Sequence, residues 1–127
     1  MPWCRCGEET RNGGSMDAPE QITIEEFARA DLRVGTIRGA EPHPKADRLL
    51  VLQVDLGEAS PRQLVAGIRA AYDHRFLIGQ QVVVVANLKP AVLRGVESQG
   101  MLLAASDDAG LAVVCPGRRF APGTKVK

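Results

Sequence analysis

The stretch Gln81–Met101 has the sequence QVVVVANLKPAVLRGVESQGM and decides the fold of the whole chain. Its first part, from Val82 to Val85, is an unbroken β-branched run of the kind found in strands buried on both faces. Pro90 cannot donate to a strand ladder and disfavours helix at the residue before it, so the strand must end close to Lys89. We therefore expect a rigid strand that delivers a binding loop to one rim of the molecule. The side chains at this rim are Asn87, Lys89, Arg94, Ser98 and Met101.

Short strand patterns lie on both sides of this stretch. Asp31–Ile37 alternates with period two, and Gly35 within it indicates a bulge, or a crowded place in a small barrel where only a residue without Cβ fits. Residues 70–78 have helical spacing and predict a short helix between the third and fourth strands. Further strands are expected at 49–56, 62–68, 101–105 and 111–114, with a hairpin turn at 107–110.

This pattern predicts an all-β fold. Five or six short strands with a small helix after the third are typical of an OB-fold, a five-stranded Greek-key barrel, here with short helices and a C-terminal strand extension. A β-sandwich is the competing interpretation.

The first 20 residues differ from the rest, being polar and without period. They predict a disordered leader, or a segment that precedes a natural start at Met16, so the folded domain is expected at 21–127. Thr23 and Glu26 form a capping box, which predicts a short helix to about Ala30 with Ile24 and Phe27 on its inner face. The two prolines of 41–47 predict a turn that belongs to neither helix nor strand ladder.

Charge and composition exclude several classes of protein. The net charge of +1 argues against coating nucleic acid by bulk charge, and five aromatic residues are few for a protein that stacks many bases. Any RNA-binding charge must therefore be local. The sequence contains neither an apolar run long enough to span a membrane nor a secretion signal, so we expect a cytoplasmic protein.

Catalysis and metal binding are not indicated. The two histidines form no Ser-His-Asp or Cys-His set, and the Cys4-x-Cys6 spacing lacks the pattern of a zinc site, so we expect no enzyme, metal or cofactor. His43, between two prolines, is either a turn residue or a contact for phosphate.

Basic residues near strand ends point to a different role. At the rim of a barrel they could bind phosphates, while Asn87 and Ser98 could bond to ribose or bases and Met101 could instead belong to the core. The alternative is that these charges are dispersed and solvated. The residues are Arg33, Lys45, Arg48, Lys89 and Arg94.

Four motifs resemble those of one known family. Residues 27–35 resemble F-x-x-x-D-L-R-V-G, residues 43–49 resemble H-P-x-A-D-K/R-L, and 87–90 and 98–101 match N-L-K-P and S-x-G-M. The family is the structure-specific tRNA-binding domain found at the C-terminus of many bacterial methionyl-tRNA synthetases. It also occurs as a free-standing tRNA-binding protein and in eukaryotic synthetase cofactors. The resemblance covers residues 22–127.

The resemblance implies an OB-fold homodimer that recognises the fold of tRNA by shape rather than by anticodon sequence. Such a protein acts alone or raises the affinity of methionyl-tRNA synthetase for tRNA. The implied contacts are Asn87, Ser98 and Met101, assisted by the nearby basic residues. We expect the dimer to pair strand edges and C-terminal segments, burying Leu111, Val113 and Val114.

Two points qualify this assignment. The family often has V-S-G-I where this chain has Val65-Ala66-Gly67-Ile68, so a serine hydroxyl is missing at Ala66. A related branch of the family is an export-associated chaperone that binds peptides, and this function is the alternative. That branch departs from the N-L-K-P and S-x-G-M motifs, which are intact here.

Overall fold

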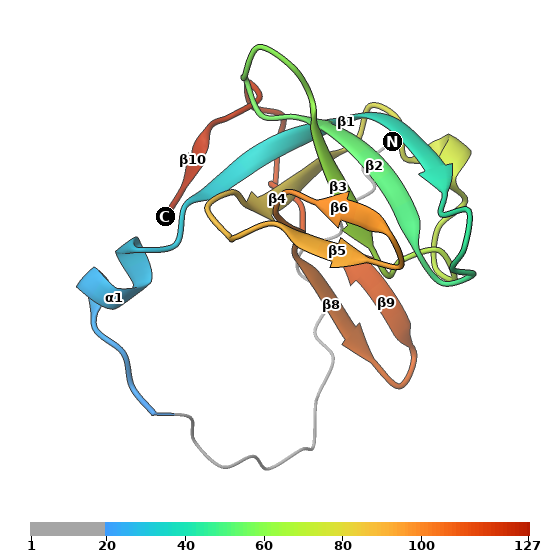
Figure 1. Cartoon of the computed structure of the whole chain (residues 1–127). Coiled ribbons are helices and arrows are strands. Elements are labelled where there is room, and N and C mark those ends of the chain that lie inside the picture. Colours follow the sequence, from blue (N-terminus) through green and yellow to red (C-terminus); the bar gives the residue numbers. More distant parts are fainter. Residues whose placement is uncertain (1–19) are drawn as a thin grey trace.

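The computed structural model describes residues 20–127. The leader expected at 1–20, with Cys4 and Cys6, lies outside this range except for Glu20. Within the range the chain forms a nearly closed barrel of antiparallel strands in the order β3-β2-β1-β4-β7, which confirms the OB-type barrel (Figure 1). The strands are β1 (Leu32–Pro42), β2 (Leu50–Asp55), β3 (Arg62–Ala66), β4 (Gln81–Val85) and β7 (Met101–Leu102).

The core is built mainly from valine and leucine on β2, β3 and β4. All five residues of β4 are buried, as its β-branched run predicts. The longest strand, β1, pairs with β2 on one side and β4 on the other, so that Ile37 faces Val54 and Val34 faces Val83. The expected C-terminal extension is β10 (Lys125–Val126), which pairs with the beginning of β1.

Gly35 occupies the crowded position that the sequence predicts. A Cβ atom there would lie 2.5 Å from Val54 Cγ1 and 2.9 Å from Leu56 Cδ2, closer than side chains approach one another. The bulge of β1 lies further along, between Ile37 and Gly39. Gly35 therefore lets β1 pass close to the side chains of β2.

Both short helices differ from expectation. Helix α1 (Ile24–Ala28) has the predicted capping box, but Ile24 is 81% exposed and Phe27 is 45% exposed, so neither lies on an inner face. The helix precedes β1 and projects from the barrel, and no other element within residues 20–127 covers it (Figure 1). The helix expected at 70–78 is reduced to the 3₁₀ turn η1 (His74–Phe76), because the Asp73 side chain accepts from the Arg75 amide and starts the turn there.

The beginning of the predicted 41–47 turn also differs from expectation. Pro42 is the last residue of β1 and pairs with Leu50, so only the residues after it leave the ladder. Proline is tolerated at this strand end because the next ladder bond comes from the His43 amide, which donates to Leu49 O.

The expected strand 101–105 is divided at Leu103 into β7 and β8 (Ala104–Asp107). Leu103 bonds to both Val83 and Val114, and beyond it β8 and β9 (Gly110–Val113) form a separate hairpin. Asp107 accepts from the amides of Ala109 and Gly110, which confirms the predicted turn. Within residues 20–127, no helix is long and apolar enough to cross a membrane.

Candidate nucleic-acid interface

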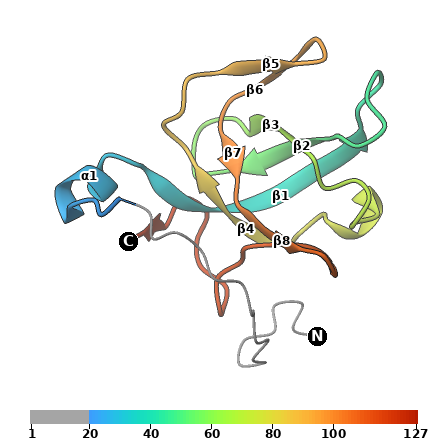
Figure 2. The same ribbon diagram turned by 90° about the horizontal axis from the view of Figure 1, so that it is seen from below.

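The region after β4, expected to be a loop, contains a hairpin of β5 (Ala91–Leu93) and β6 (Val96–Ser98). Figure 2 shows this hairpin standing to one side of the barrel sheet. Leu93 pairs with Val96, which leaves Arg94 and Gly95 as a two-residue turn with φ of 53° and 87°. Turns with both central residues at positive φ match the twist of paired strands. Arg94 therefore lies exposed at the hairpin tip.

Ser98 and Gln99 join this hairpin to the edge of β3. The Ser98 hydroxyl accepts from Val65 N at 3.0 Å and donates to Gly100 O at 2.9 Å. The side-chain oxygen Oε1 of Gln99 accepts from Gln63 N at 3.2 Å, and the backbone N–H of Gln99 donates to Gln63 O at 2.8 Å. We call Gln63, Val65, Ser98 and Gln99 the closing seam. The Ser98 side chain is thus used inside the protein and is only 4% exposed.

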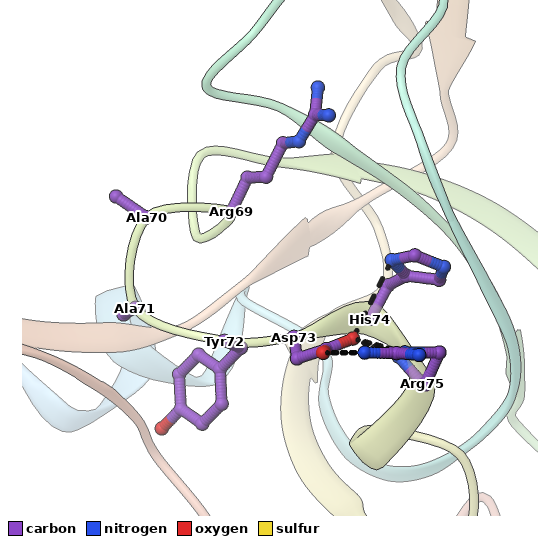
Figure 3. Close-up of a pocket in the computed structure, with 7 residues that line it drawn as sticks. All are labelled: Arg69, Ala70, Ala71, Tyr72, Asp73, His74 and Arg75. Carbon is purple, nitrogen blue, oxygen red and sulfur yellow. Dashed lines mark hydrogen bonds and ion pairs between the residues drawn. The ribbon is translucent and has the colours of Figure 1, made fainter.

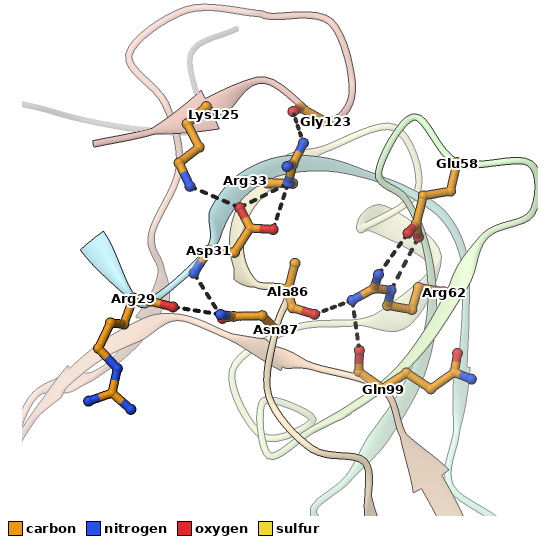
Figure 4. Close-up of polar contacts among 10 residues, drawn as sticks. All are labelled: Arg29, Asp31, Arg33, Glu58, Arg62, Ala86, Asn87, Gln99, Gly123 and Lys125. Carbon is orange, nitrogen blue, oxygen red and sulfur yellow. Dashed lines mark hydrogen bonds and ion pairs between the residues drawn. The ribbon is translucent and has the colours of Figure 1, made fainter. Parts of the chain in front are cut away.

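Asn87 ties the end of β4 to the chain that leads into β1 (Figure 4). Its Oδ1 accepts from Asp31 N at 2.8 Å, and its Nδ2 donates to Arg29 O at 2.6 Å. Both polar atoms of the amide are therefore engaged in bonds that hold the two segments together.

Arg62 was not among the predicted site residues, yet it connects the loops of two family motifs, N-L-K-P and S-x-G-M (Figure 4). Its guanidinium donates to Ala86 O, directly before Asn87, and to Gln99 O at 3.3 Å. Glu58 orients it through bonds of 3.2 and 2.7 Å. The only signal in the sequence is the spacing of four residues between Glu58 and Arg62.

The Arg33 side chain is also used in hydrogen bonds within the protein. It donates to both carboxylate oxygens of Asp31 at 3.0 Å and to Gly123 O at 3.2 Å, while Lys125 donates to Asp31 at 3.1 Å. The hydrogen bond from Arg33 is the main reason that the pKa of Asp31 lies below its ordinary value. Because this pKa is depressed by folding, the pairing stabilises the protein above the ordinary carboxyl pKa and is lost as the pH falls through the folded-state value. Arg33 thus fastens β1 to β10.

His43 is buried, at 3% exposure, and has neither nitrogen free for phosphate. Its Nδ1 accepts from Lys45 N at 2.9 Å, so the proton lies on Nε2 and is donated to Leu93 O at 3.0 Å. This bond holds the β1–β2 connection against the hairpin tip. It brings the exposed Lys45 and Arg48 into the neighbourhood of Arg94.

The remaining predicted residues are exposed. Lys89 precedes the hairpin, and Met101, at 47% exposure, follows it. Exposed apolar side chains lie near them in the sequence, on and beside β5. We call the exposed residues of the hairpin and its flanks the hairpin face; they are Leu88, Lys89, Val92, Leu93, Arg94 and Met101. Ala66, where the family often has serine, is buried opposite Leu50.

Such a surface can bind phosphates through its cations and present apolar contacts to bases or riboses. Within residues 20–127 no group of three or more histidine, cysteine or acidic side chains could hold a metal ion. The exposed cations and apolar side chains of the hairpin face suit binding of a charged polymer.

Comparison with known proteins finds one family model, described as "Putative tRNA binding domain", which matches residues 32–125. The methionine–tRNA ligase of Thermococcus kodakarensis is 49% identical over 108 residues, which are 85% of this chain and 14% of that enzyme. The methionine–tRNA ligase of Deinococcus radiodurans is 51% identical over 107 residues, 84% of this chain and 16% of the enzyme. The chain thus spans about a seventh of the length of these relatives.

Two solved structures resemble the whole barrel. The MetRS-related protein from Pyrococcus horikoshii superposes with a TM-score of 0.78 at 32% identity, covering 86% of this chain and 100% of that one. The chaperone CsaA from Bacillus anthracis gives a TM-score of 0.76 at 31% identity, covering 85% and 100%.

Proposed function

Because this chain belongs to the tRNA-binding domain family, we propose that it binds tRNA through the hairpin face and the β1–β2 connection beside it. The proposal is that it recognises the shape of the tRNA backbone rather than the anticodon. Double-stranded A-form RNA hides its base edges in a deep, narrow groove, so shape and phosphate contacts dominate recognition there.

The observation that supports this proposal best is that some motif residues make hydrogen bonds within the protein while their neighbours are exposed. Asn87 and Ser98 are engaged in internal hydrogen bonds, while Lys89 and Met101, their neighbours in the same motifs, are exposed. A rigid frame that presents a few exposed side chains is how binding loops are usually built. We assign direct contacts to Lys45, Arg48, Lys89, Arg94 and Met101, and a positioning role to Arg33, Asn87 and Ser98.

The domain is proposed to be a non-catalytic module without a cofactor, acting in the cytoplasm. It works either alone or in association with a methionine–tRNA ligase. In the second case tethering raises the local concentration of tRNA near the enzyme.

A homodimer is part of the same proposal. Val114 is 39% exposed and lies beside the β8–β9 hairpin, whose outer side chains are open to solvent. Leu111 packs partly against the barrel core. Val113, expected at the dimer contact, is 7% exposed within a single chain and belongs to that core, so we leave it out of the proposed contact.

A peptide-binding chaperone is the second candidate, supported by the likeness to CsaA and by the exposed apolar side chains of the hairpin face. Two observations favour tRNA. The N-L-K-P and S-x-G-M motifs are intact at residues 87–90 and 98–101, and the hairpin face contains two cations among its apolar side chains.

Titration against total tRNA at physiological salt tests the proposal, with a paired RNA duplex, an unstructured RNA and an extended peptide as competitors. Light scattering gives the mass of the complex. Preference for tRNA over both RNA competitors, at the mass of a dimer with RNA, is the expected result. Equal binding to all RNAs would mean that charge acts alone, and binding of the peptide only would favour the chaperone.

Lys89→Ala is expected to weaken binding of every tRNA by a similar factor and to reduce the slope of log K against log salt concentration by about one, because it removes one phosphate contact. Titrations of several purified tRNAs at four salt concentrations measure both quantities. Lys127→Ala, at the chain end beyond β10, is the matched control. A loss confined to one isoacceptor would contradict recognition by shape.

Met101→Ala is expected to lower tRNA affinity while changing the melting temperature little, because the side chain is half exposed. Its neighbour Leu102, at 9% exposure, provides the opposite control: Leu102→Ala should cost about 2–4 kcal/mol of stability. Melting curves and titrations on both variants separate the two effects. If Met101→Ala melts as early as Leu102→Ala and still binds, Met101 is a core residue.

A further inference from the structure

The connection between β3 and β4 presents an aromatic ring to solvent with an arginine side chain beside it. Phe76, in η1, is 74% exposed, more than the other aromatic side chains of residues 20–127. The guanidinium of Arg75 lies 6.0 Å from the centre of its ring. Residues 69–75 line an adjoining open pocket of about 440 Å³. In Figure 3, Arg69 and His74 point away from Tyr72.

This segment is held firmly in place. Leu77, directly after Phe76, is fully buried, and the Tyr72 hydroxyl accepts from Val113 N at 3.0 Å. Asp73 accepts two bonds from the Arg75 side chain, at 3.1 and 2.7 Å, so these two charges offset each other. The Arg69 guanidinium has no hydrogen-bond or ionic partner in the part of the chain that the structure describes. The exposed ring and the uncompensated cation are therefore presented by a fixed backbone.

The segment is continuous with the proposed tRNA surface. The Arg69 amide donates to Arg48 O at 3.4 Å, and Arg48 lies in the β1–β2 connection that His43 fastens to Leu93 at the hairpin tip. In both Figure 1 and Figure 2 this connection lies between the hairpin tip and η1. The segments between the hairpin tip and η1 therefore carry four basic residues; they are Arg94, Lys45, Arg48 and Arg69.

We infer that Phe76 and Arg69 form a second contact site, which takes an unpaired nucleotide of the tRNA held by the hairpin face. The Phe76 ring stacks on the base, and Arg69 binds the adjacent phosphate. Paired bases are already stacked inside the duplex, so only the loops or the 3′ end of a tRNA can supply this nucleotide. This inference rests on the proposed tRNA binding, and it assigns a base contact to a surface that otherwise reads only backbone shape.

Phe76→Ala tests the site by comparing two RNAs, an intact tRNA and a fully paired duplex. The variant should bind tRNA about tenfold more weakly and the duplex unchanged, since a stacked base is the interaction removed. Because Phe76 is so exposed, its melting temperature should match that of the wild type. Ile78→Ala is the matched control, an exposed apolar residue (56%) two positions away that has no aromatic ring to stack on a base, and should bind both RNAs normally.

A spectroscopic measurement makes the stacking visible. Trp3 is the single tryptophan of the chain, so Phe76→Trp in a Trp3→Phe background places the only indole at the site. Its fluorescence should be quenched by tRNA and not by the duplex. Removing the unpaired 3′ nucleotides of the tRNA then shows whether the stacked base comes from that end or from a loop.

The outcomes separate this site from the proposed function. If the wild type does not prefer tRNA, the function itself fails. If it binds tRNA normally but Phe76→Ala binds as tightly and the indole is not quenched, the second site alone is overturned. Equal losses on tRNA and duplex would also overturn it, because a paired RNA offers no base to stack.

Discussion

Gly35→Ala should reduce the free energy of unfolding by about 3 kcal/mol, the upper range for forcing extra volume into a packed core. The added Cβ would lie 2.5 Å from Val54 Cγ1 and 2.9 Å from Leu56 Cδ2. Val54 is fully buried between neighbouring strands, so it cannot move aside without displacing β2. Denaturant unfolding of Gly35→Ala and of the wild type measures this loss of stability.

Gly39 provides the control on the same strand. A Cβ there would make only ordinary contacts, 3.6 Å from Gln53 Cβ, so Gly39→Ala should be neutral or stabilise by up to about 1 kcal/mol. Equal destabilisation by the two changes would show that strand flexibility, rather than the close approach at Gly35, sets the requirement for glycine.

Ser98→Ala should cost about 2 kcal/mol of stability and also weaken tRNA binding. It leaves the Val65 amide, in a buried part of β3, without its acceptor, and an unsatisfied buried donor bears its full desolvation cost. It also frees Gly100, and with it the backbone that presents Met101. Thermal melting and tRNA titration measure the two losses.

Ser106→Ala, on the exposed β8–β9 hairpin, is the matched control and should change neither quantity. If Ser98→Ala lost affinity with an unchanged melting temperature, the hydroxyl would contact RNA directly, as the family resemblance first suggested.

The barrel was predictable because its strands have strong local signals. The β-branched run of β4, the capping box at Thr23 and the Asp107 turn all specify structure through residues close in sequence, and each is confirmed. The β5–β6 hairpin lacked such a signal, since its turn is Arg94-Gly95 rather than Asn-Gly or Asp-Gly. The apolar spacing of 70–78 suggested a helix, but the cap at Asp73 confines the turn to three residues.

The sequence predicted where the candidate site lies, but not which of its side chains are exposed and which form hydrogen bonds within the protein. The motifs correctly located the loops, yet Asn87, Ser98 and Arg33 each bond to a partner far away in the sequence, at separations of 56, 33 and 90 residues. Only the folded chain brings these partners together. Arg62 was missed for the same reason, because the two carbonyls that it joins belong to loops on either side of the β5–β6 hairpin.

The closing seam has a consequence for motion. Elsewhere the barrel is held by backbone ladders, whose bonds break only when strands separate, but the Val65 amide is held by a serine side chain that can rotate on its own. We therefore expect the barrel to open locally along the closing seam before the ladders of its other strands separate. The rate of hydrogen exchange at the Val65 amide should therefore report how often the loop that presents Met101 opens.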